Sequence, residues 1–238
     1  MIRFSLFGVP VSIHPTLWLT LAILGRGFMV SNMMELMSVL LFIIAALVVL
    51  LAHEMGHALV GRSLGGGHPS VYLAWMGGDC TNETARLTRM QGVVMTAAGP
   101  LSSLAVGLVS LFLLCLYVGD FQLGALFGCT FAMGYVPTIA LQEFPPLVMV
   151  FFFSLIEVSC WWTALNLLPI FPLDGGQIMQ GLMKSQRQVH GISLAVAVIF
   201  ALFFATLGMW LMTIFMVLLA VLNRKFYQES HPENSDFH

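Results

Sequence analysis

Residues 36–61 read LMSVLLFIIAALVVLLAHEMGHALVG, and residues 36–52 of this stretch contain no Asp, Glu, Lys or Arg. A helix that crosses a bilayer needs about 20 mostly apolar residues. The stretch therefore predicts a transmembrane helix with three ionisable side chains, His53, Glu54 and His57, toward its end. Ionisable residues are costly inside a membrane and usually serve a function there.

The composition of the whole chain also points to a bilayer. Of the 238 residues, 59% are hydrophobic and 8% are charged, and the mean hydropathy is +0.93. Soluble domains carry about 25% charged residues, so we expect lipid rather than water around most of this surface. The nine Lys and Arg residues are scattered and the net charge is −2, which argues against a nucleic-acid-binding surface.

Further apolar runs predict an all-α polytopic membrane protein with about six transmembrane helices. A helix should begin near Pro15, because proline is favoured in the first turn of a helix. The run over residues 189–222 would form a helix of about 50 Å, too long for a hydrocarbon core of about 30 Å. We therefore expect a hairpin there that turns near Gly208. The other expected spans are residues 36–61, 92–118 and 147–168.

The positions of Lys and Arg favour one topology. If the glycine-containing apolar run 121–142 makes no net crossing, every Lys and Arg except Arg26 lies on one side of the membrane. The positive-inside rule then places that side, with both termini, in the cytosol. We therefore predict a multi-pass membrane protein with both termini in the cytosol. The expected location is a bacterial inner membrane, and the expected organisation is one domain over residues 1–222 with a polar C-terminal tail over residues 223–238.

The order H-E-x-x-H at His53, Glu54 and His57 is typical of a zinc site. Residues four apart lie on one face of a helix, so both imidazoles can bind one Zn²⁺ and the glutamate can reach a water on the metal. The alternative is a buried polar cluster that pairs helices. Catalytic zinc usually has three protein ligands, and Asp174 is the best candidate for the third.

Asp174 lies in the stretch NLLPIFPLDGGQ, residues 166–177. Two prolines and two glycines around an acid at the end of a membrane helix predict irregular backbone, which is tolerated only where it is buried in protein or lines a wet cavity. The alternative role for this aspartate is to cap the next helix.

These motifs resemble those of the site-2 protease family of intramembrane zinc metalloproteases. The residues that match are His53, Glu54 and His57 of the H-E-x-x-H helix, Gly99-Pro100 of an intervening helix, and Asn166, Pro169, Pro172, Leu173, Asp174, Gly175 and Gly176 of the family's Asn/Pro/Leu-Asp-Gly motif. The resemblance implies one Zn²⁺ per chain, held by His53, His57 and Asp174. It makes Glu54 the general base, and Asn166 is placed to hydrogen-bond the substrate backbone or the oxyanion. The alternative role for Asn166 is a helix C-cap.

Two features depart from the family pattern. Many relatives carry an asparagine a few positions after the Gly-Pro pair, where this chain has Leu101-Ser102-Ser103. No PDZ or CBS module is recognisable, so we expect the compact form of the family, with a single transmembrane metalloprotease domain over residues 1–222.

A polar segment between the first two long spans contains a predicted β-hairpin. Residues 71–76 are strand-like and are followed by Gly77-Gly78. This strand could be an edge strand that pairs with an extended substrate, in which case Tyr72, Leu73, Ala74 and Trp75 would contact it. The alternative is an ordinary hairpin at the membrane interface, with Trp75 as an anchor.

The expected function is therefore an intramembrane zinc metalloprotease that cuts peptide bonds in or near the transmembrane segments of membrane proteins, with single-span substrates. One alternative is a membrane zinc enzyme that cuts soluble peptides or lipid-linked substrates. Another is a non-proteolytic scaffold or transporter that retains the fold. Glu54 argues against a scaffold, and a transporter would be expected to show repeated halves. The sequence does not indicate an oligomeric state.

Overall fold

The computed structural model describes residues 1–75, 77–82 and 86–230. They divide into two compact units. The first unit comprises Met1–Arg86 and Ala98–Thr163, and the second comprises Leu87–Ala97 and Ala164–His238. Two helices, α3 (Arg89–Val118) and α6 (Pro146–Asn166), contribute residues to both units.

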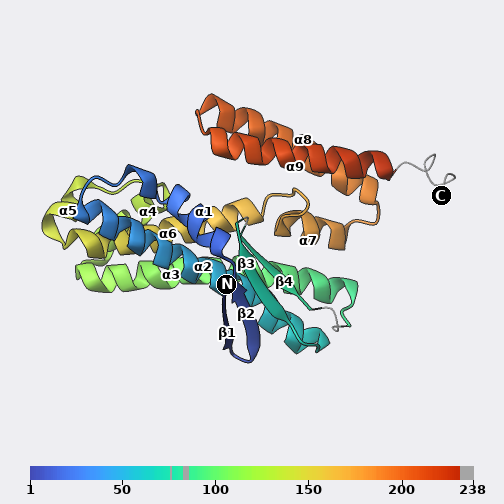
Figure 1. Ribbon diagram of the computed structural model, residues 1–238, viewed down its shortest axis with the longest axis horizontal. Coiled ribbons are helices and arrows are strands. Elements are labelled where there is room, and N and C mark those ends of the chain that lie inside the picture. The colour runs from blue at the N-terminus through green and yellow to red at the C-terminus, as the bar shows by residue number, and fades with distance from the viewer. Residues whose placement is uncertain (76, 83–85, 231–238) are drawn as a thin grey trace. The chain divides into compact units, whose positions relative to one another are not determined.

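A four-stranded sheet belongs to the first unit (Figure 1). Strands β1 (Ile2–Leu6) and β2 (Val9–Ile13) form an antiparallel hairpin, β2 pairs in parallel with β3 (Ser70–Ala74), and β3 pairs antiparallel with β4 (Gly77–Thr81). The order β1-β2-β3-β4 leaves β1 and β4 at the edges. The β-hairpin predicted from residues 71–76 and Gly77-Gly78 is thus confirmed, and its strands β3 and β4 are half of a larger sheet.

One face of this sheet packs against helices α1 (Pro15–Leu24) and α2 (Met33–Gly65). Alternating side chains of β2 and β3 are buried, as the period of two in a strand requires. The buried cluster contains Val9, Val11, Ile13, Val71 and Leu73 from the strands, Leu17 and Leu21 from α1, and Ala46, Leu50, Met55 and Ala58 from α2. The sheet therefore lies against the segment of α2 that carries the H-E-x-x-H residues.

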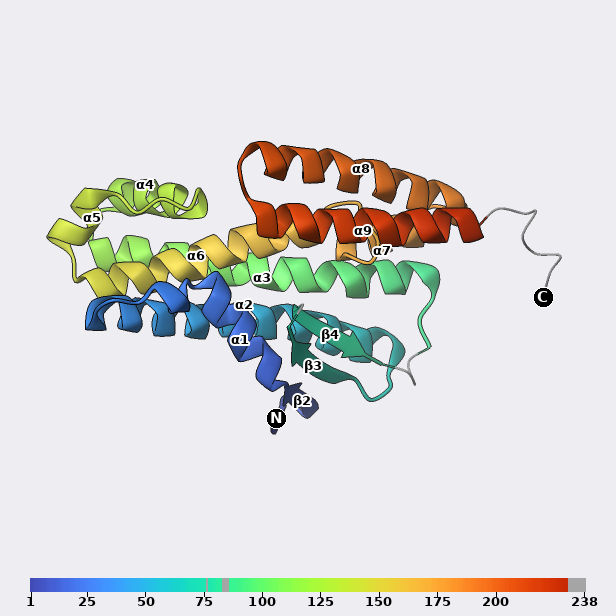
Figure 2. The same cartoon turned by 45° about the horizontal axis from the view of Figure 1, so that its top comes forward.

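Helix α2 is held at its start by Asn32, whose side chain accepts a hydrogen bond of 2.9 Å from the backbone N–H of Glu35. In the first unit α2 lies beside α3 and α6 (Figure 2). Ala45 and Val49 of α2 pack with Leu155 of α6. Small residues on α2 let the helices approach closely, as in many membrane bundles.

The segment between α3 and α6 folds as two short helices, α4 (Phe121–Ala132) and α5 (Thr138–Glu143). Lengths of 12 and 6 residues correspond to about 18 and 9 Å, too short to cross a core of about 30 Å. Their buried side chains join α3 and α6 in one cluster of Leu114, Phe127, Phe131, Ala140, Met149 and Ile156.

The second unit contains α7 (Asp174–Leu182), α8 (Gln186–Thr206) and α9 (Trp210–Glu229). Helices α8 and α9 form the predicted hairpin, and Gly208 lies in its turn with φ +70°. Helix α9 continues to Glu229, through the first residues of the predicted polar tail, with Lys225 and Glu229 paired at 3.8 Å. Residues 231–238 of that tail lie outside the described residues.

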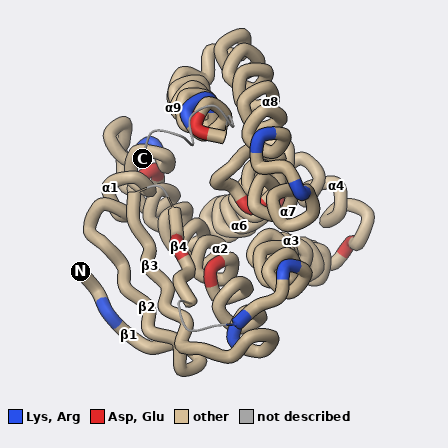
Figure 3. The backbone as a smooth tube through the Cα atoms, turned by 90° about the vertical axis from the view of Figure 1, so that its right-hand side faces the viewer, with Lys and Arg blue, Asp and Glu red and all other residues tan. Residues whose placement is uncertain are grey.

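Five helices in the described part of the chain are long and apolar enough to cross a membrane: α2, α3, α6, α8 and α9. The predicted first span is shorter than expected, because α1 begins at Pro15 as predicted but has only 10 residues. Charged residues are sparse along the chain (Figure 3). The predicted class, an all-α membrane protein with about six helices and a small β element, is confirmed, with the helix number approximate.

Candidate metal centre

The two histidines of the H-E-x-x-H motif face each other on α2. Both side chains are buried, and their Nε2 atoms lie 3.2 Å apart. Two nitrogens bound to one zinc ion at about 2.0–2.1 Å with tetrahedral angles would be about 3.3–3.4 Å apart. The geometry of this pair therefore fits a shared metal ion.

Close packing against α3 fixes this part of α2. A Cβ atom at Gly99 would overlap the His57 imidazole, so only glycine lets α3 approach the ring. The Gly99-Pro100 pair that the sequence singled out is therefore a packing surface for a candidate ligand.

Glu54 lies next to the edge strand β4. Its side chain is buried, and a Cβ atom at Gly78 would overlap the Glu54 carboxylate. The candidate base is thus in direct contact with the backbone of β4, which is an edge strand of the sheet that the described residues form.

Cys80, on the same strand, is not an alternative nucleophile. Burial, together with the nearby carboxylates of Glu54 and Asp79, raises the pKa of its thiol to about 12. Because the thiolate is the reactive form, Cys80 remains an unreactive thiol at neutral pH.

Asp174 is buried and is the first residue of α7. Leu173 occupies the N-cap position of this helix, so the structure does not support the alternative in which Asp174 is the capping residue. Asn166, the other polar residue of the motif, is buried and is the last residue of α6.

Three residues of α8 and α9 hold the segment that precedes Asp174. The backbone N–H of Phe171 donates to Ser193 Oγ at 3.0 Å, and Asn223 Nδ2 donates to the carbonyl of Phe171 at 2.6 Å. His190 Nδ1 lies 3.1 Å from Asn223 Oδ1. Sequence reasoning missed these three residues; the only local signal was polar side chains within otherwise apolar helices.

His53, His57 and Asp174 each offer one ligand atom, and this buried group could hold a metal ion. Two imidazole nitrogens and one carboxylate oxygen are donors that catalytic zinc sites use. The donor set is the one predicted from the sequence.

The predicted substrate strand is not at an edge, which corrects one expectation. Strand β3, with Tyr72, Leu73 and Ala74, pairs with β2 on one side and β4 on the other, so its backbone has no open side for a substrate. Leu73 is fully buried, whereas Tyr72 and Trp75 are exposed. The edge strand on this side of the sheet is β4.

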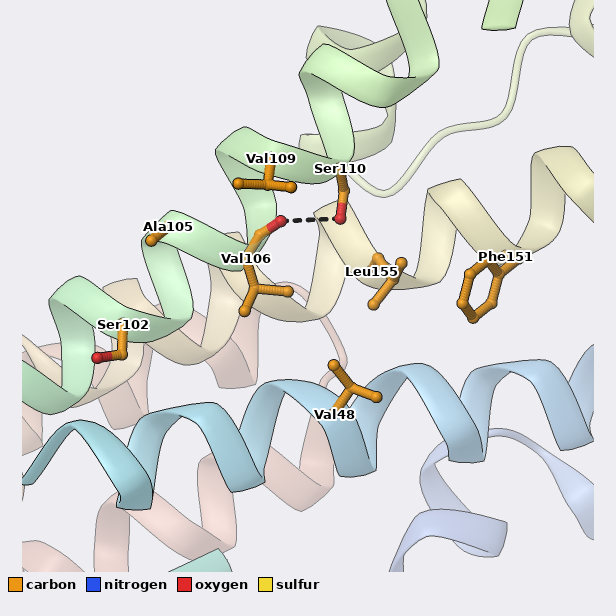
Figure 4. Close-up of a pocket in the computed structure, with 8 residues that line it drawn as sticks. All are labelled: Val48, Ser102, Ala105, Val106, Val109, Ser110, Phe151 and Leu155. Atoms are coloured by element: carbon orange, nitrogen blue, oxygen red, sulfur yellow. Dashed lines mark hydrogen bonds between the residues drawn. The ribbon is translucent and has the colours of Figure 1, made fainter. Parts of the chain in front are cut away.

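A cavity of about 370 Å³ lies elsewhere in the first unit, between α2, α3 and α6 (Figure 4). Most of its wall is apolar, and the hydroxyls of Ser102 and Ser110 donate to carbonyls of their own helix, those of Ala98 and Val106. None of the predicted site residues lines it. This cavity therefore offers hydrocarbon contacts rather than catalytic groups.

Comparison with known proteins agrees with the motifs. The family model described as Peptidase family M50 matches residues 41–207. A curated zinc metalloprotease from Methanocaldococcus jannaschii is 26% identical over 225 residues, which are 92% of this chain and 56% of that protein, so the chain spans about half the length of this relative. The solved structure of the site-2 protease from Methanocaldococcus jannaschii shares the fold, with a TM-score of 0.58 and 20% identity over 95% of this chain and 94% of that one. The chain therefore belongs to peptidase family M50, the site-2 protease family.

Proposed function

We propose that this chain is an intramembrane zinc metalloprotease that hydrolyses peptide bonds in or near the transmembrane segments of membrane proteins. The observation that carries the proposal is a buried H-E-x-x-H group, with Nε2 atoms 3.2 Å apart, inside a 33-residue helix apolar enough to cross a membrane. Ionisable side chains are costly inside a membrane and usually serve a function there.

His53, His57 and Asp174 are the proposed ligands of one Zn²⁺ per chain. A bound zinc ion supplies Lewis acidity to the scissile carbonyl and to water. The remaining chemistry belongs to the chain. Glu54 accepts a proton from the attacking water and returns it to the leaving amine, while Asn166 hydrogen-bonds the substrate backbone or the oxyanion.

The substrate is proposed to bind as an added strand on β4. A transmembrane helix hides its peptide bonds, so it must unwind before it is cut, and an open strand edge can pair with the unwound backbone. Contact between Gly78 and Glu54 supports β4 in this role. Tyr72 and Trp75 remain candidates for side-chain contacts with a substrate, which is a single-span membrane protein in this proposal.

The proposed location is a bacterial inner membrane, with both termini in the cytosol. Five long helices alone would place the termini on opposite sides. The proposal therefore requires the chain before α2 to make a sixth crossing. Helix α1 has 10 residues and is about 15 Å long, too short to cross a core of about 30 Å by itself, so the crossing would have to include the chain on both sides of it.

The substrate can be found by comparing membrane proteomes of cells that carry the wild-type protein or Glu54→Gln. An uncleaved single-span protein should accumulate only in the Glu54→Gln cells. Glu143→Gln, at an exposed position at the end of α5, is the matched control and should resemble wild type. If Glu54→Gln and wild-type cells give the same membrane proteome under conditions of expression, the proteolytic function loses its support and the scaffold alternative gains it.

A further inference from the structure

The ring nitrogen of His53 that faces away from His57 has a specific partner. His53 Nδ1 lies 3.4 Å from Ser103 Oγ, whereas its Nε2 lies 3.2 Å from His57 Nε2. Ser103 is on α3, one turn after Gly99, and is completely buried. Ser103 is therefore placed to act on His53 from the side opposite the candidate metal.

We propose that Ser103, itself held by Thr163, is a positioning residue that fixes the tautomer and ring orientation of His53 for metal binding. A histidine that binds metal through Nε2 must carry its proton on Nδ1, and that N–H needs an acceptor. The proposal adds this function to the proposed metal centre and rests on it.

The surrounding groups prepare Ser103 Oγ to accept. Its hydroxyl hydrogen can go to the carbonyl of Pro100, at 3.0 Å, or to Thr163 Oγ1, at 2.9 Å. A hydroxyl oxygen has two lone pairs. Either hydrogen arrangement leaves one of them for the His53 Nδ1–H, even when Thr163 donates to the other.

Helix α6 holds the same imidazole from a second side. Trp162, the neighbour of Thr163, meets the His53 ring edge-on, with ring centroids 6.0 Å apart and an interplanar angle of 78°. Rotation of the imidazole would both break the Ser103 contact and disrupt this ring packing. Two consecutive residues of α6 thus act on the orientation of His53: Trp162 contacts its ring directly, and Thr163 contacts Ser103.

Ser103 belongs to the segment after Gly99-Pro100 in which this chain departs from the family pattern. Where many relatives of the family carry an asparagine a few positions after the Gly-Pro pair, this chain has Leu101-Ser102-Ser103. Of the two serines, Ser103 contacts the ligand and Ser102 donates to Ala98 of its own helix.

The test is the affinity of the purified, detergent-solubilised protein for zinc, measured by competition with a chromophoric chelator. Partners of metal-bound histidines typically contribute 10–100-fold in metal affinity, so Ser103→Ala should weaken zinc binding by roughly that factor. Ser110→Ala is the matched control: Ser110 is a buried serine on the same helix, and its hydroxyl donates to Val106. It should bind zinc like the wild type.

Two substitutions at Thr163 distinguish the effect of its hydroxyl from the effect of its packing. They also provide a test of the proposal if Ser103→Ala does not fold. Thr163→Val keeps the shape but loses the hydroxyl and should weaken zinc binding, whereas Thr163→Ser keeps the hydroxyl and should not. In a protein that already carries Ser103→Ala, Thr163→Val should lower the zinc affinity less than it does in the wild type. The two residues act on His53 through the same chain of contacts, so their effects should not add.

Equal zinc affinity in Ser103→Ala and Ser110→Ala, or in Thr163→Val and Thr163→Ser, would overturn the positioning role while leaving the metal centre intact. A wild-type protein that binds no zinc would instead overturn the metal centre, and this proposal with it.

Discussion

At the scale of single residues, the candidate centre depends on side chains whose surroundings leave little freedom. The His57 ring packs on Gly99, the Glu54 carboxylate packs on Gly78, and His53 lies between Ser103 and Trp162. Catalytic groups must be held close to their productive geometry, because small displacements are costly in rate. The glycines and the serine are therefore as much a part of the site as the residues of the motif.

The assignment of Asp174 as the third ligand can be tested by zinc content. Asp174→Ala removes the carboxylate donor, so zinc per chain should fall from about one in the wild type to well below it, as measured by elemental analysis of dialysed protein. Asp79→Ala removes an exposed aspartate of β4 and should leave zinc content unchanged. Full zinc occupancy in Asp174→Ala would exclude it as a required ligand.

The sequence predicted the ligand types but not their supporting contacts. The H-E-x-x-H spacing is a local pattern, and a helix brings its residues together wherever the helix lies. Contacts between His53, Ser103 and Thr163 join residues 50 and 60 positions apart, so no local pattern marks them. The same holds for Asn223, which lies 52 positions from Phe171.

At the scale of elements, the edge strand β4 links the candidate base to the proposed substrate site. Gly78→Ala should leave zinc content near wild type but strongly reduce peptide cleavage, because the new methyl group would displace the Glu54 carboxylate. Zinc analysis and cleavage of a peptide substrate in detergent measure the two effects separately.

Gly92→Ala is the control for this substitution. Gly92 lies in α3, and among the described residues no atom outside its own helix backbone and its chain neighbours lies within 4 Å of the position of an added methyl group, so cleavage should be unchanged. Normal cleavage by Gly78→Ala would contradict the proposed arrangement of β4 and Glu54.

Helices α8 and α9 act as a support for the segment before Asp174. Asn223→Ala removes the donor to the Phe171 carbonyl and the partner of His190, and leaving buried polar groups unsatisfied costs about 1–3 kcal/mol. We expect a lower unfolding free energy and weaker zinc binding, measured by chemical denaturation in detergent and by chelator competition. Thr213→Ala, on the same helix, removes only a hydroxyl that donates to Met209; if both variants bind zinc equally well, α9 has no role in supporting the site.

The elements were predictable where a local signal exists. Pro15 begins α1, and Gly208 turns the α8–α9 hairpin, as expected from the backbone preferences of these residues. The sequence did not predict strands β1 and β2, which precede the helix expected at Pro15. The parallel pairing of β2 with β3 joins Val11 to Val71, and nothing near either residue specifies such a distant partner.

At the scale of the whole molecule, the membrane is the solvent that explains the composition. Many large apolar side chains of the long helices are exposed, including Leu40 and Val48 on α2 and Leu108 and Phe112 on α3. Water would make this exposure unfavourable, whereas lipid makes it the normal state.

The topology can be tested by labelling an introduced cysteine. In a protein whose four native cysteines are replaced, Ser235→Cys should react with a membrane-impermeant maleimide only after the cells are opened, because the Lys and Arg distribution favours cytosolic termini. A cysteine placed next to Arg3 should behave in the same way. Labelling of either site in intact cells would contradict the six-crossing topology.

The central claim is that the H-E-x-x-H group performs metal-dependent proteolysis, and Glu54→Gln tests it most directly. Glutamine keeps the size of the side chain and a hydrogen-bonding oxygen but cannot act as a base at neutral pH, so zinc content and folding should remain near wild type. Cleavage of a single-span substrate by purified protein should fall by roughly 10²–10⁴-fold, as is typical when a general base is lost. A Glu54→Gln protein that binds zinc and still cleaves at a rate near wild type would contradict the account.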